Sequence, residues 1–104
     1  MLKRILVANR GEIACRILRA CKEAGIEGVA IHAANDAGTL FTEIADIVVQ
    51  LEGEGLNETY LNIEQIIHIA LENQCDGIHP GFGFLSERAE FAQAVIDAGI
   101  TWIG

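Results

Sequence analysis

The chain combines two hydrophobic patterns: short continuous apolar runs, and longer stretches whose apolar positions recur every three to four residues. The continuous runs predict five buried strands, at residues 3–8, 28–32, 46–51, 76–79 and 100–103. The helical spacing predicts four helices, at residues 9–24, 40–45, 63–73 and 87–98. Continuously apolar strands that alternate with helices indicate a parallel sheet covered on both faces. We therefore expect a three-layer α/β domain whose strands are ordered 3-2-1-4-5.

Polar residues at the predicted helix starts suggest three caps. Asn9 with Glu12, and Asn62 with Gln65, have the spacing of a capping box, and Ser86 is placed to cap the last helix. In the first helix, helical spacing predicts a core stripe made of Ile13, Ile17, Ala20, Cys21 and Ala24. The acidic stretch at residues 52–59 is expected to be a loop.

In the predicted strand order the first and fourth strands are neighbours. The connections that follow these two strands run over opposite faces of the sheet. A ligand site is expected in the crevice beyond the carboxyl ends of such strands. One turn there holds Asn9, Arg10 and Gly11, and the other holds Gly81 and Gly83 around an aromatic residue. Because glycine lets bare backbone approach a ligand, we predict that both turns face the substrate.

Composition limits the chain to one modest domain, residues 1–104, and to a few classes of protein. No apolar run reaches the roughly 20 residues that span a bilayer. The first residues lead directly into a predicted strand rather than into a signal peptide. We therefore expect a cytoplasmic protein without membrane contact. The three cysteines are not spaced as metal ligands and lie in helix or core segments, so we expect free buried thiols and no metal site.

Charge is distributed unevenly along the chain. Six basic residues and one acid in the first 22 positions make that part near +5, while the rest is near −13, for a net charge of −8. This balance argues against nucleic-acid binding. A confined basic patch suits a small anion or an acidic partner surface, and a solvated basic helix explains it equally well.

Other ligand classes fit poorly. The first strand-to-helix turn holds only Gly11, whereas a dinucleotide-binding turn carries three glycines, and no phosphate-binding G-x-x-x-x-G-K-[ST] loop is present. The first and third strands do not end in the paired acids of a phosphate receiver, and the three histidines form no nucleophile cluster.

Two segments stand out, ANRGEIA at residues 8–14 and HPGFGFLSE at residues 79–87. They closely resemble the amino-terminal domain of biotin carboxylase. Further colinear matches to that domain lie at residues 16–21, 45–46, 60–63 and 91–92. The resemblance implies a Rossmann-like fold that precedes an ATP-grasp domain. It also implies an enzyme that uses ATP, Mg²⁺ and bicarbonate to carboxylate biotin on a carrier protein. Such enzymes serve carboxylases of the acetyl-CoA, propionyl-CoA or pyruvate type, including those of fatty acid biosynthesis.

The same resemblance assigns roles to particular residues. Gly81, Phe82 and Gly83 would border the biotin pocket, and Arg16, Arg19 and Glu23 on the first helix would take part in a homodimer interface, although intrahelical ion pairs on a solvated face explain those three as well. Further partners would be the ATP-grasp domain, the biotin carboxyl carrier protein and a carboxyltransferase. Nucleotide, metal and bicarbonate ligands and the catalytic base belong to parts of the family outside these 104 residues, so we expect the fragment alone to bind no cofactor and to be inactive.

Two positions depart from the family pattern. Phe82 stands where the family usually has tyrosine, and Phe41 where histidine is common. The alternatives to an enzyme domain are a stand-alone small-ligand module that uses the same crevice and a structural docking or dimerisation domain.

Overall fold

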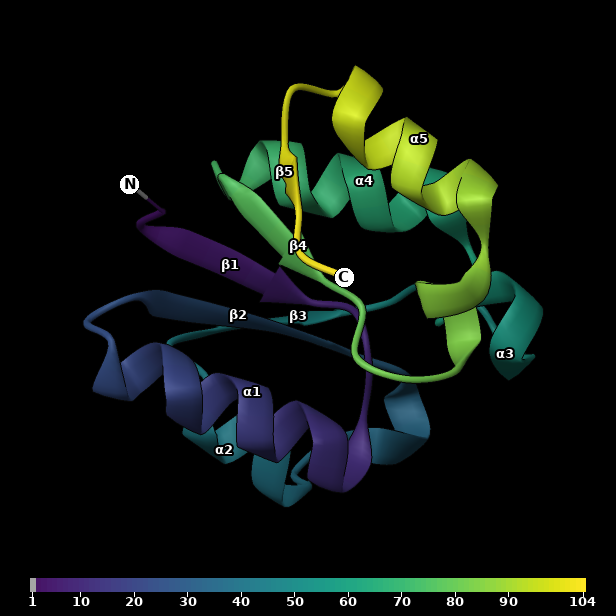
Figure 1. Cartoon of the computed structure of the whole chain (residues 1–104). Helices are drawn as coiled ribbons and strands as arrows, with labels where there is room; N and C mark the ends of the chain where they lie inside the picture. The colour runs from purple at the N-terminus through teal and green to yellow at the C-terminus, as the bar shows by residue number, and fades with distance from the viewer. Residues whose placement is uncertain (1) are drawn as a thin grey trace.

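A computed structural model describes residues 2–104 and contains a single five-stranded sheet (Figure 1). The strands are β1 (Arg4–Val7), β2 (Glu27–His32), β3 (Ile47–Gln50), β4 (Gly77–His79) and β5 (Thr101–Trp102). All four strand pairs are parallel, and the order is β3-β2-β1-β4-β5. The predicted strand order is confirmed.

Helices cover both faces of the sheet. In Figure 1, α1 (Gly11–Glu23) and α2 (Leu40–Ile44) lie below it, and α4 (Ile63–Glu72) and α5 (Ala89–Asp97) lie above. Crossovers between parallel strands are right-handed. The chain builds outward from β1 in one direction to β3 and then in the other direction to β5, so the two sets of helices must fall on opposite faces.

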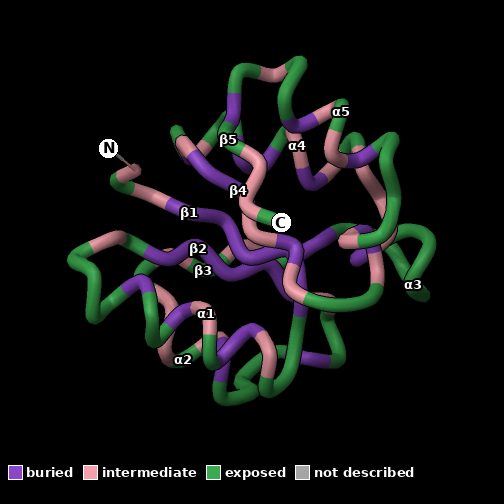
Figure 2. Tube along the Cα trace, viewed as in Figure 1, coloured by how far each residue is buried: buried purple, intermediate pink, exposed green. Residues whose placement is uncertain are grey.

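The core consists of two clusters, one on each face of the sheet. Strand side chains alternate between faces, so Leu6 of β1 packs in the cluster under α4 and α5, while Val7 packs against α1 and α2. Figure 2 shows buried backbone along β1, β2 and β4 and exposed residues on the outer sides of the helices. Phe41, one of the two expected departures from the family pattern, is buried in the cluster on the α1 side, so the side chain at this position is part of the core.

The predicted core stripe of α1 is confirmed only at Cys21 and is otherwise displaced by a rotation of the helix. The buried residues of α1 are Ala14, Cys15, Leu18 and Cys21. The predicted Ile13 and Ile17 are only half-buried, and Ala20 and Ala24 are exposed. Apolar residues cover so much of this helix that two overlapping stripes are possible. Gly28 on β2 decides between them, because a Cβ atom there would lie 2.6 Å from the Leu18 Cδ2 atom.

Two of the three predicted caps are wrong. Arg10 is the residue before α1 and no side chain caps this helix, since the Asn9 side chain binds elsewhere. Residues 84–87, including Ser86, form a short 3₁₀ helix, and α5 begins only at Ala89, again without a side-chain cap. The cap of α4 is confirmed, because the Asn62 Oδ1 atom accepts a hydrogen bond of 3.0 Å from the Gln65 backbone N–H.

The remaining differences are small. The predicted acidic loop contains one helical turn, α3 (Gly55–Glu58). The three cysteines, Cys15, Cys21 and Cys75, are free and buried, as predicted. In residues 2–104 no helix has the length and apolar character needed to cross a membrane.

Candidate functional site

The turn after β4 is built around two glycines in the left-handed region, Gly81 with φ of 66° and Gly83 with φ of 69°. A Cβ atom on Gly81 would lie 2.8 Å from both Asn9 Nδ2 and Ile13 Cγ2, so this position needs glycine for space as well as for conformation. A Cβ atom on Gly83 would meet nothing within 4 Å. Between them, Phe82 is 75% exposed. The turn is therefore packed on its inner side and open on its outer side.

Asn9 holds the inner side of this turn. It is 2% exposed and follows β1, which pairs with β4. Its Nδ2 group donates hydrogen bonds to the carbonyl oxygens of Pro80 at 2.8 Å and Phe82 at 2.7 Å. Its Oδ1 atom accepts a hydrogen bond of 2.8 Å from the Arg10 backbone N–H. The two predicted turns do lie side by side, and the Asn9 carboxamide joins them through these hydrogen bonds.

His79, the last residue of β4, gives the turn a third internal contact. The Gly81 backbone N–H donates a hydrogen bond of 3.1 Å to the His79 Nδ1 atom, so the proton of the neutral ring must be on Nε2. Burial lowers the pKa of His79, which favours this neutral form. The sequence analysis placed the three histidines in no nucleophile cluster, and nothing in the spacing of His79 identified this contact.

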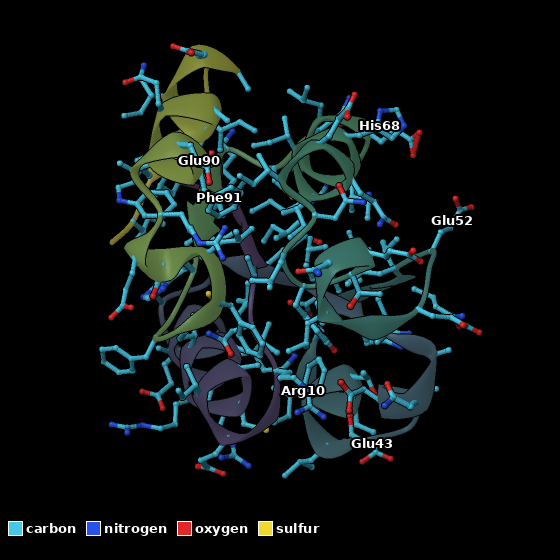
Figure 3. All side chains as sticks on the ribbon, turned by 90° about the vertical axis from the view of Figure 1, so that its right-hand side faces the viewer. Arg10, Glu43, Glu52, His68, Glu90 and Phe91 are labelled. Carbon is cyan, nitrogen blue, oxygen red and sulfur yellow. The ribbon has the colours of Figure 1, made fainter. Side chains whose placement is uncertain are left out.

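The other two predicted crevice residues do not face the glycine turn. Gly11 is exposed, with no other side chain near its Cβ position. Figure 3 shows the Arg10 side chain between the start of α1 and the segment that follows β2. There its guanidinium forms two hydrogen bonds with the carboxylate of Asp36, one of them 2.7 Å from Nε to Oδ2. Arg10 therefore organises a different part of the same sheet edge.

Asp36 is the centre of that second polar cluster and is almost completely buried. It also accepts a hydrogen bond of 2.6 Å from the Tyr60 hydroxyl, which in turn accepts one of 3.1 Å from the Ala33 backbone N–H. The Arg10 guanidinium holds the pKa of Asp36 below its usual value, while burial, reinforced by Asp36, raises the pKa of Tyr60 to about 12. Sequence reasoning missed Asp36 and Tyr60, because they are 24 residues apart. Asp36 lies in a turn and Tyr60 lies before a helix, so neither takes part in a periodic pattern.

A cavity of about 520 Å³ lies beside the glycine turn, on the α1 side of the sheet. Gly81 and Phe82 border it together with His79. Most of its remaining lining is aliphatic: Ile13, Ile17 and Ala20 come from the predicted stripe of α1, and Ile5, Ile26 and Ile103 from outside that helix. The exposed Arg16 borders the cavity as well. The three α1 stripe residues are not fully buried because they line this open cavity.

The residues predicted to form a dimer interface share the exposed side of α1. Arg16, Arg19 and Glu23 are all exposed. Within residues 2–104 neither Arg16 nor Arg19 has a carboxylate within 4.0 Å, so the alternative of intrahelical ion pairs is not realised. Three other basic residues of the amino-terminal patch, Arg4, Arg10 and Lys22, are paired with acids of this chain.

Comparisons with known proteins agree with this architecture over its full length. The chain is 52% identical over 105 aligned residues to mitochondrial pyruvate carboxylase of Homo sapiens, and the match covers 99% of this chain and 9% of the relative. It is 48% identical to biotin carboxylase of Haemophilus influenzae, covering 100% of this chain and 23% of that protein. The chain thus spans less than a quarter of the length of these relatives.

Solved structures give the same result. The biotin carboxylase domain dimer of 2-oxoglutarate carboxylase from Hydrogenobacter thermophilus, in complex with MgADP, ADP and bicarbonate, superimposes with a TM-score of 0.96 at 48% identity, covering 100% of this chain and 23% of that one. The family model for the biotin carboxylase N-terminal domain matches residues 1–104. The chain therefore belongs to the biotin carboxylase N-terminal domain family.

Proposed function

We propose that this domain is the amino-terminal part of an enzyme that uses ATP and bicarbonate to carboxylate biotin on a carrier protein. The observation that carries the proposal is the family match over all of residues 1–104, with relatives that include biotin carboxylases and pyruvate carboxylase. The product would be passed to a carboxyltransferase. The final acceptor of the carboxyl group would be that of an acetyl-CoA, propionyl-CoA or pyruvate type of carboxylase. An enzyme of the acetyl-CoA type would serve fatty acid biosynthesis. The location would be cytoplasmic.

In this enzyme the turn of Gly81, Phe82 and Gly83 would border the biotin pocket. The exposed Phe82 ring offers an apolar face to the hydrocarbon part of biotin. The Gly83 backbone N–H has no acceptor in the part of the chain that the structure describes, so it is free to donate to the ureido oxygen of biotin. The Gly81 N–H is already bound to His79, so Gly81 would serve the pocket by its shape.

We place the sites for ATP, Mg²⁺ and bicarbonate outside this domain. In residues 2–104 no group of three or more histidine, cysteine or acidic side chains is arranged to hold a metal ion. Arg10, which follows β1, offers no phosphate clamp because its guanidinium is committed to Asp36. Phosphoryl transfer needs positioned metal and cationic clamps, so we propose that this chain contributes no such step.

Two surfaces would join this domain to the rest of the enzyme. The aliphatic cavity of about 520 Å³ would pack against the remainder of the enzyme, including its ATP-grasp domain. Arg16, Arg19 and Glu23 would meet their own copies across a two-fold dimer interface, where a surface with both charges complements itself. The unpaired state of both arginines within residues 2–104 supports this assignment.

The test is an assay of bicarbonate-dependent ADP release with free biotin. The full-length protein that contains this domain should carry out the reaction, and the 104-residue chain should not. The absence of biotin-dependent turnover in the full-length protein would refute the proposal. Activity of the 104 residues alone would refute the placement of the nucleotide site.

The open cavity also favours a second function, that of a stand-alone module that binds a small apolar ligand. Calorimetric titration of the 104-residue chain with biotin and with ADP, beside a measurement of its mass in solution, separates the two. Saturable binding of biotin by the isolated chain would favour the module. Self-association without ligand binding would favour a docking or dimerisation domain.

A further inference from the structure

We propose that Asn9 is a positioning residue for biotin, because its side chain orients the turn of Pro80 to Gly83 through the two carbonyl oxygens that it binds. The inference rests on the proposed function, since it concerns how this chain presents its turn to biotin. Asn9 does not itself face the substrate, as it is 2% exposed and lies on the inner side of the turn.

The planar trans peptide bond between Phe82 and Gly83 links the contact that Asn9 makes on the inner side of the turn to the orientation of a backbone N–H on its outer side. In a trans peptide the C=O and the following N–H point in opposite directions. The Phe82 carbonyl is directed inward by its 2.7 Å hydrogen bond from Asn9. The N–H of Gly83 belongs to the same peptide unit, so it is directed away from Asn9, and no acceptor in residues 2–104 takes it up.

Only an asparagine supplies all the contacts that this geometry requires. One amide nitrogen carries two donors, which reach the carbonyls on either side of Gly81, and the amide oxygen accepts the Arg10 N–H. An aspartate has the same shape but, when ionised, accepts only and would face two carbonyl oxygens. A serine hydroxyl has a single donor for two carbonyls.

Gly81 and His79 complete the arrangement. A Cβ atom on Gly81 would displace the Asn9 amide, from whose nitrogen it would lie 2.8 Å away. The Gly81 N–H is held by His79 Nδ1 at 3.1 Å. Three backbone groups of the turn are thus fixed from within, while the Phe82 ring, 75% exposed, and the Gly83 N–H are left to the outer side. This division is expected of a turn that is preorganised for a ligand.

The experiment compares Asn9→Asp with the wild type in the full-length protein, by steady-state kinetics with free biotin and with ATP. A turn misplaced by a fraction of an ångström should raise the KM for biotin by about tenfold or more, while the KM for ATP changes by less than about twofold. The matched control is Asn62→Asp. It makes the same change of amide to carboxylate at a helix cap whose acceptor oxygen is retained, so both KM values should stay at the wild-type level.

Asn9→Ser covers the case in which Asn9→Asp does not fold, because serine keeps one donor without adding a charge. Its KM for biotin should rise less than that of the aspartate variant, because no charge then faces the two carbonyl oxygens. An unchanged KM for biotin in a folded Asn9 variant, or equal rises in both KM values, would overturn the positioning role. A wild-type protein without biotin-dependent turnover would instead overturn the proposed function, and the inference with it.

Discussion

The hydrogen bond from Tyr60 to Asp36 is the contact whose energetic role can be tested most directly. Tyr60→Phe removes one hydroxyl and keeps the buried ring. The lost bond of 2.6 Å has an ionised, almost fully buried acceptor, and a hydrogen bond to a charged group contributes about 1.5–3 kcal/mol. The Ala33 N–H also loses its acceptor, while the more apolar ring offsets part of the cost. We therefore expect a loss of about 2 kcal/mol in the free energy of unfolding.

The assay is urea unfolding of the 104-residue chain, followed by circular dichroism, with a thermal melt beside it. For a domain of this size 2 kcal/mol corresponds to a fall of about 10 °C in the melting temperature. Thr42→Val is the matched control, because it removes a hydroxyl whose bond to the Thr39 carbonyl is exposed. It should cost less than about 0.5 kcal/mol. Equal unfolding midpoints for Tyr60→Phe and wild type would show that this hydrogen bond does not stabilise the fold.

The same variant has a pH signature. The pKa of Tyr60 is raised to about 12 in the folded chain, against about 10 in the unfolded chain. The stability that this raised pKa represents is complete below pH of about 10 and is lost as pH rises to about 12. The stability advantage of the wild type over Tyr60→Phe should shrink across that window. Because Tyr60 is the only tyrosine, tyrosinate absorbance follows its titration directly.

Three further predictions concern the helix face, the turn and the dimer. Leu18→Ala should destabilise the chain by about 2–5 kcal/mol, and Ile17→Ala by clearly less because Ile17 lines an open cavity; equal urea midpoints would restore the originally predicted stripe. Phe82→Tyr in the full-length protein should change the KM for biotin and barely move the melting temperature, since the ring is 75% exposed; the opposite pattern would assign Phe82 to the core. Arg16→Glu combined with Arg19→Glu should raise the dimer dissociation constant of the full-length protein, most clearly at low salt. An identical dimer population in sedimentation across a dilution series would exclude this interface.

The layers and the strand order of the sheet were predictable from the hydrophobic pattern of the chain. Five apolar runs separated by helical spacing admit few arrangements, because parallel strands need helical crossovers and these crossovers are right-handed. Local signals also sufficed where cap and partner lie within one turn, as for Asn62 and Gln65. The glycines at positions 81 and 83 were recognisable as a turn for the same reason, since their conformation is a property of the local backbone.

The rotation of α1 and the partners of the polar residues depend on contacts between segments that are distant in the chain. The apolar surface of α1 is broad enough for two stripes, and the missing side chain of Gly28 on β2 selects the one centred on Leu18. Asn9 looked like a helix cap, but β4 brings the Pro80 and Phe82 carbonyls to its amide from more than 70 residues away. Arg10, Asp36 and Tyr60 meet for the same reason. A hydrogen bond between distant segments depends on the spatial order of the strands, so it leaves no periodic signal in the chain.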